Sequence, residues 1–293
     1  MGVPKVFVVG QARSGTTWTR AILAHGPVIS GPESHIFPRL HRYLVQEPVD
    51  AGWRERVLVA FDEASQGPLL DGQGPHRWIH RSSLEGLLDE TIASGRVGDP
   101  AARWIIDSVL TSYFWANGGG PGDQLVEKTP RHLRYADTIL RWWPEARIIE
   151  MVRDGRDVCL SLRAKAEHRL WAAGELDEQI QRWAESVRIG RRLSSLAEST
   201  GRWLTVRYED VSDDPRREIA RMFGFLDVPF DDAFLDRVVR ATNIDQMRNP
   251  FDHHHVRAGV AGAWRTELTD AEQRRCLELA GAELQTMGYD TTG

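Results

Sequence analysis

The sequence predicts an α/β fold in which a central, mostly parallel sheet is flanked by helices. Two observations indicate this fold class. An uninterrupted apolar run over residues 6–9 is typical of a buried strand, and a helical pattern follows it at once. Helical patterns over 131–143 and 176–198 are then each followed by a β-forming segment, over 147–152 and 203–206. Such alternation is typical of parallel sheets, whose ligands bind at the carboxyl ends of the strands.

Other elements follow from the same patterns. Residues 39–125 are helical in pattern, but glycine and proline interrupt them repeatedly, so we expect helices joined by loops. The helix over 131–143 is expected to stop at Pro144, and another to begin near Arg156. Further helices are expected over 215–225, 232–240 and 270–287. No internal repeat or linker divides the sequence, so we predict a single domain over residues 1–293.

Composition narrows the class of protein. The chain has 293 residues, 41% hydrophobic and 27% charged, which is typical of a globular protein with an ample core. A net charge of −5 argues against nucleic acid as the main partner. Because no apolar run approaches the length of a membrane-spanning helix or a signal peptide, we expect a cytoplasmic protein without a membrane partner. Two cysteines cannot form a disulfide framework.

The loop over residues 10–17 is the first candidate site. It lies between the first predicted strand and a helix with Trp18 on its apolar face, where backbone N–H groups and the helix dipole favour an anion. An ATP-hydrolysing P-loop requires lysine in the position that Thr16 occupies. Arg13 supplies a cation inside the loop instead, and its planar guanidinium can bind a phosphate or a sulfate.

A second candidate site follows the strand over 147–152. Arg153 begins the segment Arg-Asp-Gly-Arg-Asp-Val, and Ser161 lies eight residues further on. If a helix begins near Arg156, Arg153 and Ser161 can both meet one phosphate, distinct from the one at the first loop. Solvated ion pairing is the alternative interpretation of this segment.

The third candidate site is the segment from Arg257 to Arg265. Gly259 and Gly262 allow the backbone to approach a ligand closely, while the arginines and Trp264 offer charge and a stacking face. A surface loop is the alternative. The preceding triple histidine, 253–255, comes without the partner spacing of a metal site, so we predict no bound metal.

Together these segments resemble the sulfotransferases that use 3′-phosphoadenosine 5′-phosphosulfate (PAPS), and most closely a bacterial or tyrosylprotein-sulfotransferase-like branch. Tyr208-Glu209-Asp210 is similar to the family segment whose tyrosine lies by the adenine. The resemblance implies a P-loop-like three-layer fold and PAPS as co-substrate. It implies the following donor-binding residues: Arg13, Ser14, Gly15, Thr16, Thr17, Trp18, Arg153, Ser161, Tyr208, Arg257, Gly259, Trp264 and Arg265. Trp18 stacks on adenine in this interpretation, or belongs to the core.

The resemblance also implies a reaction. A sulfuryl group would pass from PAPS to a hydroxyl of a small-molecule acceptor by in-line displacement, with Arg13 and the loop amides stabilising the leaving group. Glu33 lies in a segment similar to the one that carries the catalytic glutamate of tyrosylprotein sulfotransferases, and His35 is the competing base. Lys128, one of three lysines, resembles the family lysine that stabilises the transferring group. Its alternative is an ion pair with Glu127 or another acid.

Departures from the pattern set the limits of the resemblance. Cytosolic sulfotransferases have lysine where this chain has Arg13, and a catalytic histidine where it has Pro130, which argues against His132 as a base. We expect residues 39–125 to shape the acceptor pocket, whereas the sequence does not predict the acceptor or the oligomeric state. Two alternative functions stay open: a P-loop nucleotide kinase or NTPase, which Thr16 argues against, and a nucleotide-binding module without catalysis.

Overall fold

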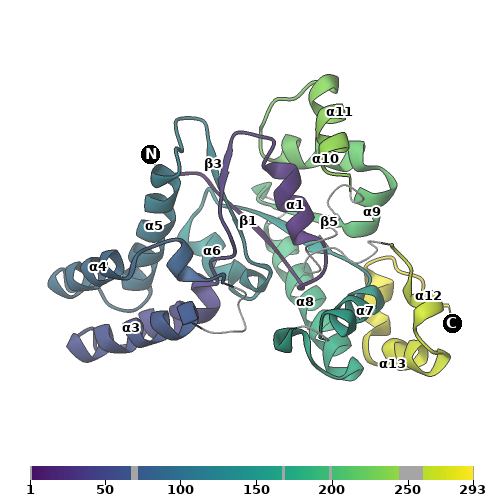
Figure 1. Ribbon diagram of the computed structural model, residues 1–293, viewed down its shortest axis with the longest axis horizontal. Coiled ribbons are helices and arrows are strands. Elements are labelled where there is room, and N and C mark those ends of the chain that lie inside the picture. The colour runs from purple at the N-terminus through teal and green to yellow at the C-terminus, as the bar shows by residue number, and fades with distance from the viewer. Residues whose placement is uncertain (1, 67–71, 167–168, 198–199, 244–259, 293) are drawn as a thin grey trace. The chain divides into compact units, whose positions relative to one another are not determined.

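The computed structural model describes residues 2–66, 72–166, 169–197, 200–243 and 260–292. Five strands form one parallel sheet in the order β2-β3-β1-β4-β5, which confirms the predicted α/β class (Figure 1). The strands are β1 (Lys5–Gly10), β2 (Val28–Ser30), β3 (Gln124–Lys128), β4 (Arg147–Val152) and β5 (Trp203–Arg207). The strand predicted over 6–9 is therefore the middle strand of the sheet.

β1 is buried along its whole length, as its uninterrupted apolar sequence predicts for a strand covered on both faces. Its last residue must be glycine for a steric reason. A Cβ atom on Gly10, which has φ +144°, would lie 2.3 Å from the backbone oxygen of Met151. The close approach of β1 to β4 thus fixes the point at which the chain leaves the sheet.

The backbone contacts divide the chain into two compact units, and β1 contributes to both. The first unit comprises Met1–Phe7 and Pro27–Ala146. In it β2 pairs with β3 in parallel, with Ile29 opposite Leu125. Its helices are η1 (Phe37–His41, a π-helix), α2 (Arg42–Leu44), α3 (Ala51–Gln66), η3 (Pro75–Arg77), α4 (Arg81–Ala93), α5 (Gly98–Ala116), η4 (Pro130–Tyr135) and α6 (Ala136–Trp142). Within this unit α3 and α4 lie side by side (Figure 1).

The second unit comprises Val8–Gly26 and Arg147–Gly293. Its strands β4 and β5 pair in parallel, with Glu150 opposite Thr205. Its helices are α1 (Thr16–Leu23), α7 (Gly155–Ala166), η5 (Leu170–Ala172), α8 (Leu176–Ala197), α9 (Tyr208–Asp213), α10 (Pro215–Phe225), α11 (Asp232–Ala241), α12 (Trp264–Glu267) and α13 (Asp270–Thr286). A core cluster around the fully buried Trp183 joins α7, α8 and α13. The single domain predicted over 1–293 stays a prediction.

Local signals explain the helices whose bounds the sequence predicts well. α10 begins where Asp214 accepts a hydrogen bond from the Arg217 amide at 3.0 Å, with Pro215 in the first helical position. α13 begins with a capping box between Thr269 and Glu272.

Within the described parts of the chain, no helix is both long enough and apolar enough to span a membrane.

The helix predicted over 131–143 is wrong in its first half. Residues Pro130–Tyr135 form the 3₁₀ helix η4, and α6 begins only at Ala136. Thr129 before it is extended, and His132 and Leu133 are buried. Pro130 and the burial of both side chains within one short turn favour the tighter helix at this point.

Candidate active site

The loop over residues 10–17 has the geometry of an anion site. Arg13 has φ +76°, a left-handed conformation that is uncommon for a residue other than glycine, and Gly15 has φ +99° at the N-cap of α1. The Ser14 hydroxyl is fully buried and has no hydrogen-bond partner among the described residues. A strained backbone and an unpartnered buried hydroxyl at a helix N-terminus are the features that an anionic group would complete.

Arg13 joins this loop to the second predicted motif. Its Nε donates a hydrogen bond to Ser161 Oγ of α7 at 3.0 Å. The sequence predicts separate phosphates for the loop and for the pair Arg153 and Ser161, and the structure brings Ser161 within direct reach of Arg13. Both residues lie in the second unit, 148 positions apart in the chain.

An aromatic group lies beside the loop. The Tyr208 ring contacts Trp18 edge-on, with centroids 5.4 Å apart, and the Arg153 guanidinium lies 4.3 Å from the Tyr208 centroid. A side chain at Gly15 would meet Tyr208 at 2.8 Å. Trp18 is 8% exposed and donates from Nε1 to the Thr242 carbonyl oxygen at 2.8 Å. The structure therefore brings four residues of the predicted donor set together in one unit.

The third motif is held by Asp157 of α7. Its carboxylate accepts hydrogen bonds from the amides of Gly262 at 2.7 Å and Trp264 at 3.0 Å. Burial raises the pKa of Asp157, although Arg153 and the two amides oppose the shift. The Arg156 guanidinium stacks on the Trp264 ring at 3.4 Å. The turn Arg-Asp-Gly-Arg-Asp is therefore a buried support for the late glycine–tryptophan segment, a role that the sequence analysis missed.

The described residues include the second half of this motif. Arg257, Gly259 and the triple histidine 253–255 lie outside the described residues. Arg265 is described: it is exposed, its Nη2 lies 3.4 Å from an Asp290 carboxylate oxygen, and its guanidinium lies against Trp264. Among the residues that the structure describes, no three histidine, cysteine or acidic side chains are grouped as a metal site would require.

Glu33, His35 and Lys128 form a second set, in the first unit. Glu33 follows β2 and Lys128 ends β3, so the carboxyl ends of two paired parallel strands bring them together. Lys128 Nζ contacts one carboxylate oxygen of Glu33, and His35 Nε2 lies 3.2 Å from the other. His35 has φ +49°, so this set too contains a left-handed residue that is not glycine.

Electrostatics fix the charge on Glu33. Burial alone would raise its pKa, but Lys128 and His35 outweigh that effect and lower the pKa of Glu33 to about 2. The carboxylate is therefore ionised at neutral pH. Its side chain is 18% exposed, so a substrate can reach it, while that of Lys128 is 4% exposed.

Glu127, beside Lys128, is almost completely buried, and Ser34 and Thr129 hydrogen-bond one oxygen of its carboxylate while His132 lies against the other. Ser34 donates to its Oε1 from both the amide and the hydroxyl, Thr129 donates from Oγ1, and His132 Nδ1 lies 2.7 Å from Oε2. Burial opposes ionisation, but His132 and the two hydroxyls lower the pKa of Glu127 below its ordinary value. From the sequence, Glu127 is expected only as an alternative ion-pair partner of Lys128.

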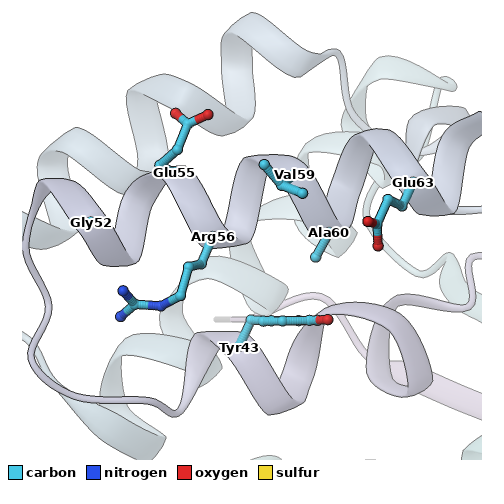
Figure 2. Close-up of a pocket in the computed structure, with 7 residues that line it drawn as sticks. All are labelled: Tyr43, Gly52, Glu55, Arg56, Val59, Ala60 and Glu63. Carbon is cyan, nitrogen blue, oxygen red and sulfur yellow. The ribbon is translucent and has the colours of Figure 1, made fainter.

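A shallow pocket of about 370 Å³ lies elsewhere in the first unit, between α2 and α3. Figure 2 shows Arg56 extending from the side of α3 that faces Tyr43. The lining residues are Tyr43, Gly52, Glu55, Arg56, Val59, Ala60 and Glu63. They include none of the predicted site residues, so the pocket does not enlarge the candidate site. The expectation that residues 39–125 shape an acceptor pocket stays a prediction.

Comparison with known proteins identifies relatives along the chain. A candidate protein-tyrosine sulfotransferase of Caenorhabditis briggsae is 26% identical over 98% of this chain and 89% of its own length. Protein-tyrosine sulfotransferase 1 of Danio rerio is 25% identical over 80% of this chain. The chain spans 56% of the length of the Danio rerio protein, so that protein has regions without a counterpart here.

Solved structures share the fold. The sulfotransferase domain of the Synechococcus PCC 7002 olefin synthase matches with a TM-score of 0.58 at 22% identity, over 99% of this chain and 96% of the domain. A mouse sulfotransferase complexed with PAP matches with a TM-score of 0.54 at 13% identity, over 97% of this chain and 85% of the mouse chain. The model of the sulfotransferase family matches residues 4–232, which contain both sets of site residues apart from the late segment. The chain therefore belongs to the sulfotransferase family, as its motifs predict.

Proposed function

We propose that the protein is an enzyme that transfers a sulfuryl group from PAPS to a hydroxyl of a small-molecule acceptor by in-line displacement. One observation carries the proposal: in a chain of the sulfotransferase family, an ionised, partly accessible carboxylate, Glu33, is held between Lys128 and His35. These are a proton acceptor, a cation for the transferring group and a second titratable group, which are the groups that the reaction requires.

The residues of the second unit fit the donor. Ser14 offers a buried hydroxyl without a partner among the described residues, and Arg13 offers a guanidinium held at Ser161. Arg153 lies beside Tyr208, where charge and a ring face can serve a nucleotide. The PAP of the mouse relative's complex supports the same donor here. We expect no metal requirement, because the sulfuryl group carries less charge than a phosphoryl group and arginine and lysine can neutralise it.

Glu33 is the proposed base. While it contacts Lys128, the low pKa of Glu33 makes it a weak one. If the Lys128 ammonium turns to the oxygens of the sulfuryl group, the largest influence lowering that pKa weakens, and Glu33 becomes a better proton acceptor as the transfer begins. Lys128 would in this way link the arrival of negative charge to the activation of the base.

His35 keeps a role in either assignment. Its Nε2 lies 3.2 Å from Glu33, so it orients the carboxylate if Glu33 is the base. If His35 is the base, Glu33 orients the imidazole instead. Substitution of each residue separately distinguishes the two.

The tyrosyl hydroxyl of a protein is the second candidate acceptor. The names of the Caenorhabditis and Danio relatives favour it. A phenol and a tyrosyl side chain present the same nucleophile, so an acceptor screen should contain small phenols and alcohols together with tyrosine-containing peptides.

Calorimetric titration tests the donor assignment first. The protein is titrated with 3′,5′-adenosine bisphosphate (PAP), ADP, and ATP with and without magnesium. We expect PAP to bind more tightly than ADP, independently of magnesium, and Arg13→Ala to weaken PAP binding at least tenfold. Preference for ATP with magnesium would instead support a P-loop phosphotransferase.

Turnover tests the base. Glu33→Ala is expected to reduce kcat by a factor of about 10²–10⁴, the usual contribution of a general base, while PAP affinity stays within twofold. His35→Ala is the companion variant. Full turnover by Glu33→Ala would transfer the role to His35, and a wild type that binds PAP but modifies none of the acceptors would favour a binding module.

A further inference from the structure

Glu127 connects the loop that carries Glu33 to the strand that carries Lys128. Its Oε1 accepts the Ser34 amide at 3.1 Å, the Ser34 hydroxyl at 2.8 Å and the Thr129 hydroxyl at 2.6 Å. Three donors converge on this oxygen, and an ionised carboxylate is the acceptor that attracts them most strongly, because it carries negative charge and no proton of its own. Ser34 lies directly between Glu33 and His35, so this oxygen holds the loop at the point between both candidate bases.

Thr129 extends the same connection. While its hydroxyl donates to Glu127, its oxygen accepts the His35 amide at 3.3 Å. The backbone of His35 is left-handed, with φ +49°, and such a conformation persists only where surrounding contacts enforce it. The hydrogen bonds made by Ser34 and by the His35 amide are among the contacts that enforce it.

The other side of Glu127 is fixed by a rigid partner. His132 is fully buried, its Nδ1 lies 2.7 Å from Oε2, and its ring lies edge-on to Phe37 with centroids 5.1 Å apart. Because the imidazole is packed between aromatic rings, the carboxylate cannot turn without losing this partner. The Phe7 ring centroid lies 6.3 Å from the centroid of the imidazole.

We propose that Glu127 is a positioning residue for the reaction: its carboxylate, fixed by His132, holds residues 33–35 so that Glu33 faces Lys128. The inference rests on the proposed role of Glu33 as base. Glu127 itself is 1% exposed, so it acts through Glu33 and does not touch the acceptor. An error of about 1 Å in the position of a reacting group can cost about a hundredfold in rate, which is the size of effect that such a residue can control.

The primary test is Glu127→Gln, which keeps the shape of the side chain and one carbonyl oxygen but removes the charge. We expect kcat to fall by about 10- to 100-fold, while the KM for PAPS and the PAP affinity stay within twofold. Glu150→Gln is the matched control, because Glu150 is a second glutamate buried in a strand, is 3% exposed and contacts neither Ser34 nor Thr129 in the described hydrogen bonds. It should keep kcat within about twofold of wild type.

A double-mutant cycle separates positioning from general structural damage. If Glu127 acts through Glu33, Glu127→Gln should lower kcat by less than threefold once Glu33→Gln is present. An equal loss in both backgrounds would overturn the inference, since it would mean that Glu127 acts independently of the base. If Glu33→Gln alone keeps wild-type kcat, the proposed function of Glu33 fails and the inference fails with it, which is a different result from a silent Glu127→Gln.

Thr129 provides the variant to use if Glu127→Gln does not fold. Thr129→Val keeps the branched shape and removes the hydroxyl, whereas Thr129→Ser keeps the hydroxyl. We expect a loss of kcat of about tenfold for valine and recovery to within about twofold for serine. Wild-type kcat in Thr129→Val would contradict the proposed connection from Glu127 to His35.

Discussion

Glu127 and Glu150 are two glutamates buried in strands of one sheet, and their ionisation differs. Glu127 of β3 is 1% exposed and Glu150 of β4 is 3% exposed. The partners of Glu127 lower its pKa below the ordinary value. Burial raises the pKa of Glu150 to about 7, because the hydrogen bonds from Thr205 and Trp203 oppose it only in part.

The difference shows that partners, not burial, decide whether a buried carboxylate carries charge. Glu127 has an imidazole at 2.7 Å and three further donors on its other oxygen. Glu150 accepts only from neutral groups in the described hydrogen bonds, at 3.2 Å from both Trp203 and Thr205. Glu127, the ionised carboxylate, lies beside the candidate base. Glu150, whose pKa lies near 7, packs against α8 at Gly190.

Replacing Glu127 and Glu150 by alanine, one at a time, should give the largest difference between these two residues, in the free energy of unfolding. Glu127→Ala leaves three buried donors of Ser34 and Thr129 without their acceptor and removes the contact with His132, so we expect the free energy of unfolding to fall by about 3–5 kcal/mol. Glu150→Ala removes an acceptor from neutral donors only and should cost about 1–3 kcal/mol. Urea denaturation at pH 7 measures both. Equal losses would mean that the partners of Glu127 contribute nothing beyond burial.

The pH dependence of the free energy of unfolding should differ between wild type and Glu150→Gln above pH 4.5. The folded protein keeps the proton on Glu150 up to a pKa of about 7, whereas the unfolded chain releases it near 4.5. The folded state therefore binds more protons between these values, so its stability falls as pH rises from 4.5 to 7, by up to about 3 kcal/mol, and is constant above. Urea midpoints over pH 4.5–8 should show this slope in wild type, and a parallel course in Glu150→Gln would refute it.

Glu33 should change the stability with pH in the opposite direction. Its pKa is lowered to about 2 in the folded protein, so the stabilisation is present above pH 4.5 and is lost as pH falls toward 2. Because the side chain is 18% exposed, we reduce the expected size to about 2 kcal/mol. The difference in unfolding free energy between wild type and Glu33→Gln, followed from pH 5 to pH 3, should shrink. A constant difference would show that Lys128 does not stabilise the ionised form.

Asp157 extends the comparison to a third buried carboxylate, which accepts hydrogen bonds from two backbone amides. Asparagine keeps one acceptor oxygen but presents N–H groups toward the second amide, so Asp157→Asn should weaken the hold on Gly262 and Trp264. We expect PAP affinity to fall about 3- to 10-fold, equivalent to about 1 kcal/mol, in calorimetry. Asp177→Asn, which alters an exposed pair with Arg275, serves as the control and should leave affinity unchanged.

Local sequence accounts for much of this fold. The apolar run of β1, the amphipathic pattern of α8 and the capped α10 are set by residues within each element, and the predicted positions agree closely with the structure. β2 was missed because three half-buried residues, Val28–Ser30, contain too little pattern to identify a strand. The helix before β4 was wrong in its first half because the burial of His132 depends on tertiary contacts.

The residues of the candidate sites also fall into those that local sequence identifies and those that depend on tertiary contacts. Arg13, Glu33 and Lys128 were identified from motifs and from resemblance to a family. The support of the Glu33 loop by Glu127 was not, because Glu127 is buried by partners such as Ser34, 93 positions away. No pattern of neighbouring residues distinguishes a glutamate with such partners from one at a surface.

Gly190 has a consequence for how this family can vary. A Cβ atom at that position of α8 would lie 1.9 Å from Glu150 Oε1, so the helix accommodates the buried carboxyl only by lacking a side chain there. Positions 150 and 190 thus share one fixed volume. In an alignment of related chains they should covary: wherever position 190 gains a side chain, position 150 should shrink, and each single exchange should be rarer than the pair.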